Sequence, residues 1–181
     1  MKYFLSTIKI FLLITLFGFS SGIAQSCEKP CALETNSNNV KATYQVSGDR
    51  LIINLSAKTT GWVAIGFGAT KYMKDADIIM GYINTDGKLV VSNEYGDGFF
   101  SHKSVESLGG KSNIKVISGN LKEGWTTMAF SIPLNPKDTK YAKSFKAGDK
   151  MKVLIAYSSD GAKNFTSIHK YKTTTYLTLG E

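Results

Sequence analysis

Short apolar runs separated by turn residues make up the sequence from residue 40 onward, and this pattern predicts strands. Apolar and polar residues alternate in 51–57, and 41–47 is rich in strand-forming residues, so the two runs predict a hairpin with one buried face. Asp86-Gly87 supplies the turn of a second predicted hairpin over 76–95. Further strands are predicted over 61–68, 113–118, 125–134, 151–159 and 173–179, with a turn over 119–124. Many short strands at close spacing predict an all-β fold, an immunoglobulin-like antiparallel β-sandwich.

Residues 135–145 are the only stretch of this region that resembles a short helix. Two prolines, Pro133 and Pro136, lie at its start, and its apolar content is low. Because proline interrupts helical hydrogen bonding beyond the first turn, an irregular connection is the favoured prediction.

The first 24 residues have the pattern of a secretory signal peptide. Lys2 precedes a short apolar core, and the small residues Gly22 and Ala24 precede the expected cleavage site. The apolar run is shorter than a membrane-spanning helix requires. We therefore expect a signal peptide over 1–24, an N-terminal segment over 25–39 and a sandwich domain over 40–181. The mature chain is expected to be exported to the periplasm or the cell exterior.

Cys27 and Cys31 are the only cysteines, and export would place them in an oxidising compartment. Their spacing predicts a disulfide that closes a short loop near the mature N-terminus. No histidine follows Cys31, so the pair does not match the C-x-x-C-H pattern of covalent haem attachment. Lipidation of Cys27 is the alternative prediction, although the preceding residues, AQS, depart from the usual lipobox.

The precursor carries a formal net charge of +8, and loss of Lys2 and Lys9 with the signal leaves +6 (8 − 2). Arg50 is the only arginine, whereas nucleic-acid surfaces rely on arginine to bind bases and phosphates. We therefore expect no nucleic-acid partner, and the charge favours an acidic protein partner or association with a membrane surface. No G-x-S-x-G or H-E-x-x-H motif is present, so the chain is not predicted to be an enzyme.

Met73 and two histidines, His102 and His169, are the candidate ligands for a metal. A thioether binds soft or borderline metals, and an imidazole binds iron, copper and zinc. Met and His together form a recognised axial pair for haem iron and leave it no open position. The ordinary alternatives are a methionine that fills space in the core and a histidine that is solvated. The pattern alone leaves these alternatives open.

Residues 61–98, GWVAIGFGATKYMKDADIIMGYINTDGKLVVSNEYGDG, resemble the DOMON family in its b-type cytochrome branch. The resemblance includes the Gly61-Trp62 motif that ends at Phe67, the Met73 loop and the strand that opens with Asp77. Residues 125–134 and 153–172 are similar to later parts of the family pattern, and the resemblance extends over about 40–179. One departure is the absence of the arginine that the family often has near Ala129.

The resemblance implies a β-sandwich that holds haem b non-covalently between Met73 and His169, with His102 as the competing ligand. Trp62, Phe67 and Tyr72 are expected to contribute to an apolar cofactor pocket. Lysines beside the ligands, Lys71 among them, are expected to bind the haem propionates in place of the missing arginine.

The implied function is an exported cytochrome domain that transfers single electrons to or from a redox protein, with a transmembrane b-type cytochrome as one such partner. The alternative is a DOMON module without haem that binds a saccharide or another small ligand. In that case Trp62 and Trp125 would stack on sugar rings.

Overall fold

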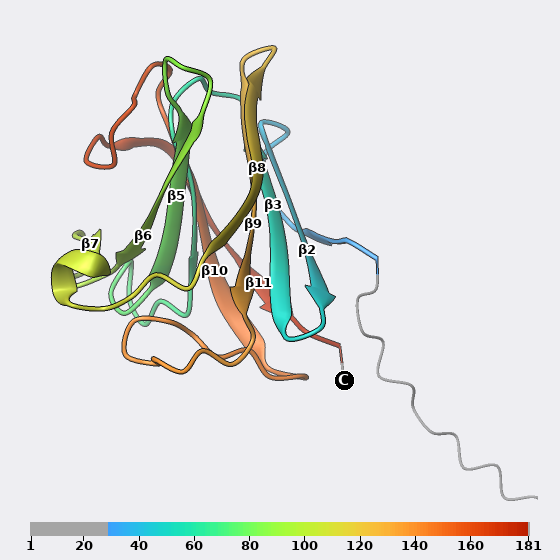
Figure 1. The fold of residues 1–181 in the computed structure, drawn as a ribbon. Helices are drawn as coiled ribbons and strands as arrows, with labels where there is room; N and C mark the ends of the chain where they lie inside the picture. Colours follow the sequence, from blue (N-terminus) through green and yellow to red (C-terminus); the bar gives the residue numbers. More distant parts are fainter. Residues whose placement is uncertain (1–28, 181) are drawn as a thin grey trace, which may run out of the picture.

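The computed structural model of the chain describes residues 29–180 as two antiparallel β-sheets packed face to face (Figure 1). The first sheet has the strand order β1-β2-β3-β9-β8, and the second has the order β11-β10-β4-β5-β6-β7. The strands are β1 Cys31–Leu33, β2 Val40–Ser47, β3 Arg50–Ala57, β4 Val63–Phe67, β5 Asp77–Ile83, β6 Leu89–Tyr95, β7 Lys103–Ser104, β8 Lys115–Lys122, β9 Trp125–Pro133, β10 Lys150–Ser158 and β11 His169–Thr178. A single 3-10 turn, η1 Glu106–Leu108, follows β7 within the described residues. The predicted antiparallel β-sandwich is confirmed.

Every predicted strand is present, although several boundaries differ from the prediction. The turn predicted over 119–124 is wrong, because β8 continues to Lys122 and Glu123-Gly124 alone make the turn, with φ of 53° and 75°. β11 begins at His169, four residues before the predicted start at residue 173. Residues 135–145 are irregular, as predicted.

The predicted signal peptide and Cys27 lie outside the described residues, so export, the Cys27–Cys31 disulfide and lipidation remain predictions. Between residues 29 and 180, no helix has the length and apolar character needed to cross a bilayer.

The core lies between the two sheets and is filled by alternate residues of each strand. In β4, Val63, Ile65 and Phe67 point inward and have no exposed surface. The intervening positions of β4, Ala64 and Gly66, face outward, yet they are buried as well. A strand that is buried on both faces requires something to cover its outer side. That cover forms a second apolar cluster, and the candidate site lies within it.

Candidate functional site

A cavity of about 620 Å³ lies on the outer face of the second sheet. Its volume falls within the roughly 300–1,000 Å³ that is usual for ligand and cofactor sites. Its lining is mainly apolar and aromatic, with a few polar side chains from β11 and the segment before it. The lining residues are Trp62, Ala64, Gly66, Tyr72, Met73, Ile78, Met80, Phe99, Phe100, His102, Leu154, Ile155, Ala156, Thr166, Ser167, Ile168, His169, Lys172, Thr173 and Thr174.

The floor of the cavity is flat because small residues occupy the centre of the sheet. Ala64 lies opposite Ala156 of β10 on one side and Met80 of β5 on the other. The next outward position is Gly66, where an added Cβ would come within 3.1 Å of Ile78 Cγ1. Larger side chains here would fill the space above the sheet, so this sequence leaves room for a broad, flat ligand.

Met73 enters the cavity from the loop between β4 and β5. Tyr72 and Asp75 on either side of it have φ of 52° and 65°, a left-handed conformation that is uncommon outside glycine. Such backbone strain is concentrated at functional sites, where the surrounding structure holds it in place.

Hydrogen bonds to the segment after β6 fix this loop. The Asp75 amide donates to the Gly96 carbonyl at 2.8 Å, and the Met73 amide donates to the Phe99 carbonyl at 3.2 Å. An added Cβ at Gly96 would lie 1.7 Å from the Met73 carbonyl oxygen, so only glycine permits this close approach. The position of Met73 therefore depends on a residue that is more than 20 positions away in the sequence.

His169 reaches the cavity from the opposite side because of a β-bulge between β10 and β11. Tyr157 pairs with Tyr171, but the next pair is Ser158 with His169, which leaves Lys170 as an extra residue. A bulge of this kind redirects side chains from one face of a sheet to the other. Without it, His169 would share the inward face of Tyr171. With it, His169 lies on the outer face together with Lys172.

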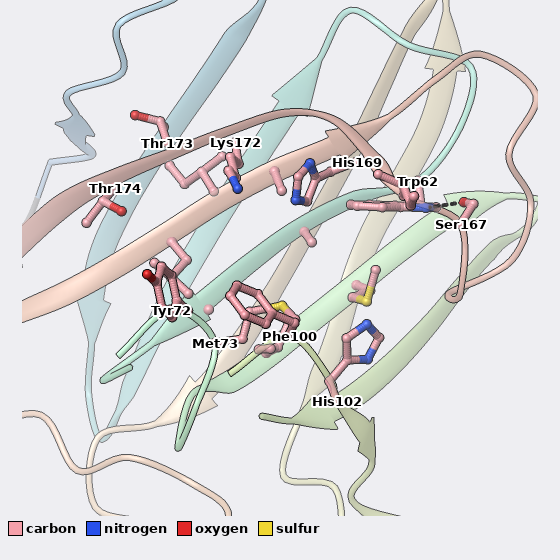
Figure 2. A pocket seen from close by; sticks show the side chains of 18 of the residues that line it. Trp62, Tyr72, Met73, Phe100, His102, Ser167, His169, Lys172, Thr173 and Thr174 are labelled. Carbon is pink, nitrogen blue, oxygen red and sulfur yellow. Dashed lines mark hydrogen bonds between the residues drawn. The ribbon is translucent and has the colours of Figure 1, made fainter. Parts of the chain in front are cut away.

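The segment before His169 is tied to Trp62. The Trp62 indole Nε1 donates to Ser167 Oγ at 2.8 Å, and the Asn164 side-chain oxygen accepts from the Ser167 amide at 2.8 Å. Trp62 is only 3% exposed and forms a wall of the cavity. Figure 2 shows the His169 ring beside Trp62, and Met73 with Phe100 on the other side of the pocket.

His102 also lines the cavity, on the side of Met73 (Figure 2). Its Nδ1 lies 3.0 Å from Glu94 Oε2, and the Ser92 hydroxyl donates to the other oxygen of the same carboxylate. Glu94 is 6% exposed, so its contact with the His102 imidazole is largely shielded from solvent. His169, by contrast, has no hydrogen-bond partner for its ring among residues 29–180.

The structure brings together four of the six residues predicted to bind the cofactor: Met73, His169, Trp62 and Tyr72 line the cavity. Phe67 does not line it, and this part of the prediction requires correction. Its side chain points into the core between the sheets and packs edge-to-face on Phe145, with ring centroids 5.3 Å apart. The inward position follows from the alternation of side chains along β4.

Lys71 also lies outside the lining and is exposed. Its Nζ lies 5.4 Å from the centroid of the Phe99 ring at the cavity mouth. Lys172 takes the place that was expected for Lys71, because it lines the cavity opposite Ala156. Sequence reasoning missed Lys172 and the neighbouring Thr174, since their orientation follows from the strand register.

Asp77 opens β5 behind the Met73 loop and is 4% exposed. Burial raises the pKa of this carboxyl to about 6, and hydrogen bonds from the Asn93 side chain and the Lys143 backbone limit the rise. The Asn93 Nδ2 donates to Asp77 Oδ1 at 2.7 Å. Asp77 is absent from the cavity lining, and its hydrogen bonds tie the start of β5 to Asn93 of β6 and to the segment at Lys143.

The fold and the cavity together define a β-sandwich protein with an apolar cavity on the outer face of one sheet. The sequence profile of the DOMON domain matches residues 36–158, which is more than half of the chain, and the chain belongs to the DOMON family. Met73 lies inside the matched region and His169 lies beyond it. No significant match was found among curated proteins.

Two solved structures share the fold at low sequence identity. The cytochrome b domain of pyranose dehydrogenase from Coprinopsis cinerea has a TM-score of 0.61 and 11% identity, with 81% of this chain and 80% of that chain covered. The cytochrome domain of cellobiose dehydrogenase from Myriococcum thermophilum has a TM-score of 0.59 and 12% identity, with 83% and 81% covered. A family 9 carbohydrate-binding module from Caldicellulosiruptor kristjanssonii has a TM-score of 0.43 and 10% identity, with 82% and 71% covered.

Proposed function

We propose that this chain is an exported b-type cytochrome domain, which holds haem b between Met73 and His169 and passes single electrons to and from a redox protein. One observation carries the proposal: a thioether and an imidazole that are far apart in the sequence line the same apolar cavity from opposite sides. Membership of the DOMON family supports it, as does the likeness to the two cytochrome domains.

The cavity suits haem in shape and in chemistry. Ala64, Gly66 and Ala156 are small residues, which leave room for the edge of a planar macrocycle that stands between the two walls of the cavity. The Met73 sulfur and the His169 imidazole are donors that match iron in softness, whereas harder cations prefer oxygen ligands. Among residues 29–180 no group of three or more His, Cys, Asp or Glu side chains forms a conventional metal site, so the two cavity ligands carry the proposal.

Haem b held by two protein side chains, Met73 and His169, would supply one-electron transfer rather than oxygen activation. Met73 would favour the reduced state, because a thioether ligand raises the reduction potential relative to a second imidazole. Trp62 and the apolar floor would exclude water from the site. Lys172 and Thr174 offer a cation and a hydroxyl to the carboxylates of the propionates.

His169 is assigned as the imidazole ligand in preference to His102. The segments that carry Met73 and His102 are neighbours, since the Met73 amide donates to the Phe99 carbonyl. Their side chains therefore enter from one wall, whereas two residues that would hold the haem between them must come from different walls. His169 occupies the opposite wall.

Haem titration of four single variants tests the assignment, because the cavity contains a matched control for each ligand. Met73→Leu and His169→Gln are each expected to lose the low-spin, six-coordinate spectrum. Met80→Leu and His102→Gln, which alter the other thioether and the other imidazole of the lining, are expected to keep it. Loss in His102→Gln with retention in His169→Gln would contradict the assignment.

No observation favours the saccharide alternative. Two lysine side chains lie over the Trp125 ring that would have to stack on a sugar, with Lys41 Nζ 5.2 Å and Lys58 Nζ 5.9 Å from its centroid. The Trp62 indole is buried and already hydrogen-bonded to Ser167. A colourless protein that gains no absorption on haem titration, yet binds glycans, would reverse this choice.

A further inference from the structure

Three exposed aromatic side chains gather on one lip of the mouth of the cavity. We call these residues, Tyr72, Phe99 and Phe100, the aromatic rim. They are 54%, 45% and 77% exposed, although they also line the cavity. Their rings contact one another, with the Tyr72 centroid 6.1 Å from that of Phe99 and 4.8 Å from that of Phe100. Ile168 on the opposite lip is 84% exposed. Large apolar groups gathered at the entrance of a site are typical of an interaction surface.

The backbone holds the aromatic rim in place. The left-handed φ of 52° at Tyr72 is strained for a residue with a large side chain. In this conformation Tyr72 is 54% exposed. Because Tyr72 precedes the proposed ligand Met73, the same loop connects the outer surface to the iron site.

Lysines flank the aromatic rim on both lips. Lys71 and Lys74 place Nζ 5.4 and 5.8 Å from the Phe99 ring centroid, and Lys170 follows His169 on the other side. None of the three forms an ion pair with a carboxylate among residues 29–180.

The acids nearest to this surface are already engaged within the protein. The Asp75 carboxylate accepts from Thr70 Oγ1 at 2.7 Å and from the Tyr95 hydroxyl at 3.2 Å. Asp97 pairs with Lys103 at 3.0 Å. The donors to Asp75 are neutral, so its charge offsets only one of the three lysines, Lys71, Lys74 and Lys170. The mouth of the cavity is therefore apolar at its centre and net positive at its border.

We propose that this surface docks the acidic face of a redox protein whose own cofactor lies beneath that face. The inference rests on the proposed function and adds to it the partner's chemistry and the residues that receive it. Unpaired lysines would steer an acidic surface toward the cavity, and the aromatic rim would exclude water from the short path between the two cofactors. Such electron-transfer encounters are small and short-lived, which suits a few exposed rings within a border of charge.

The test is stopped-flow oxidation of the reduced, haem-loaded protein by plant plastocyanin, an acidic copper protein, with ferricyanide as the small-molecule comparison. At low ionic strength the double variant Lys71→Glu/Lys74→Glu should react with plastocyanin about tenfold more slowly than the wild type. The difference should disappear in about 1 M salt, where the screening length is only about 3 Å. The matched control is Lys115→Glu/Lys122→Glu on β8, which changes the net charge equally at exposed positions of the other sheet. It should stay within about twofold of the wild type.

Phe100→Ser separates the aromatic contribution from the charge. It should slow the reaction with plastocyanin about threefold or more, since it removes an exposed ring of the kind that dominates interface energies. Because Phe100 also lines the cavity, the plastocyanin rate of this variant is divided by its own ferricyanide rate, and this ratio should fall relative to the wild type. Equal rates for the two lysine variants would overturn the proposal. It would also be overturned if wild-type protein bound phosphatidylserine vesicles through Lys71 and Lys74 while the plastocyanin rates matched the control, because the surface would then serve a membrane. A missing haem band would refute the proposed function itself. A failure of docking gives a different result, in which haem binds but the lysine and aromatic substitutions do not change the plastocyanin rate.

Discussion

Substitution of Asp77 by Asn should remove a large pH dependence from the stability of this fold. Burial raises the pKa of Asp77 from 3.8 to about 6, so the folded state holds the proton more tightly than the unfolded chain does. A raised pKa stabilises the folded state fully below the unfolded value, and this stabilisation is lost as the pH rises through about 6. A difference of about two pKa units corresponds to about 3 kcal/mol between pH 3.5 and pH 7.5.

Urea unfolding of wild type and Asp77→Asn across this pH range measures the effect. The variant cannot ionise at this position, so its free energy of unfolding minus that of wild type should increase by about 3 kcal/mol from the acidic to the neutral end. In the variant the amide nitrogen faces the Lys143 backbone donor, so the stability of the variant can differ from that of wild type at every pH. The prediction concerns only how this difference changes with pH. Asp86→Asn in the exposed β5–β6 turn is the matched control. Parallel curves for wild type and Asp77→Asn would contradict the prediction, because they would show that folding does not shift the titration of Asp77.

Three further substitutions test the placement of particular side chains. Gly96→Ala should displace the Met73 loop and weaken haem binding about tenfold or more by titration, since its Cβ would overlap the Met73 carbonyl; unchanged affinity would show that the loop adapts. Phe67→Leu should lower the free energy of unfolding by about 1–2 kcal/mol and leave the haem spectrum intact, because Phe67 packs in the core; an altered spectrum would place it at the cofactor after all. Ser167→Ala should cost about 1 kcal/mol in urea unfolding by removing the partner of the Trp62 indole, and equal stability would indicate that water replaces the hydroxyl.

Strand positions could be predicted well from the sequence because alternation is a local property. The runs 51–57 and 76–95 carry their own periodicity and turn residues, and both hairpins form where expected. The same alternation would have placed Phe67 in the core beside Val63 and Ile65. Phe67 and Trp62 belong to the same family motif, so both were predicted to line the pocket. Phe67 instead packs in the core between the sheets, and Trp62 packs in the second cluster on the outer face.

The orientation of His169 could not be read from the sequence. It depends on one unpaired residue, Lys170, in the pairing of β11 with β10, and nothing in the local pattern marks that bulge. Lys172 and Thr174 lie in the regular part of this pairing, opposite Ala156 and Leu154, and they were missed because their place in the cavity depends on which strand β11 pairs with. Met73 was predicted from its chemistry and its resemblance, but the contact with Gly96 that fixes its loop links segments that only the fold brings together.

The most direct test of haem ligation by Met73 and His169 is a near-infrared magnetic circular dichroism spectrum of the purified ferric protein, since this method reports both axial ligands at once. Ligation by Met73 and His169 predicts a low-spin iron with the charge-transfer band of a histidine–methionine pair, and loss of that band in Met73→Leu. A bis-histidine or high-spin spectrum, or a protein that binds no haem, would contradict it.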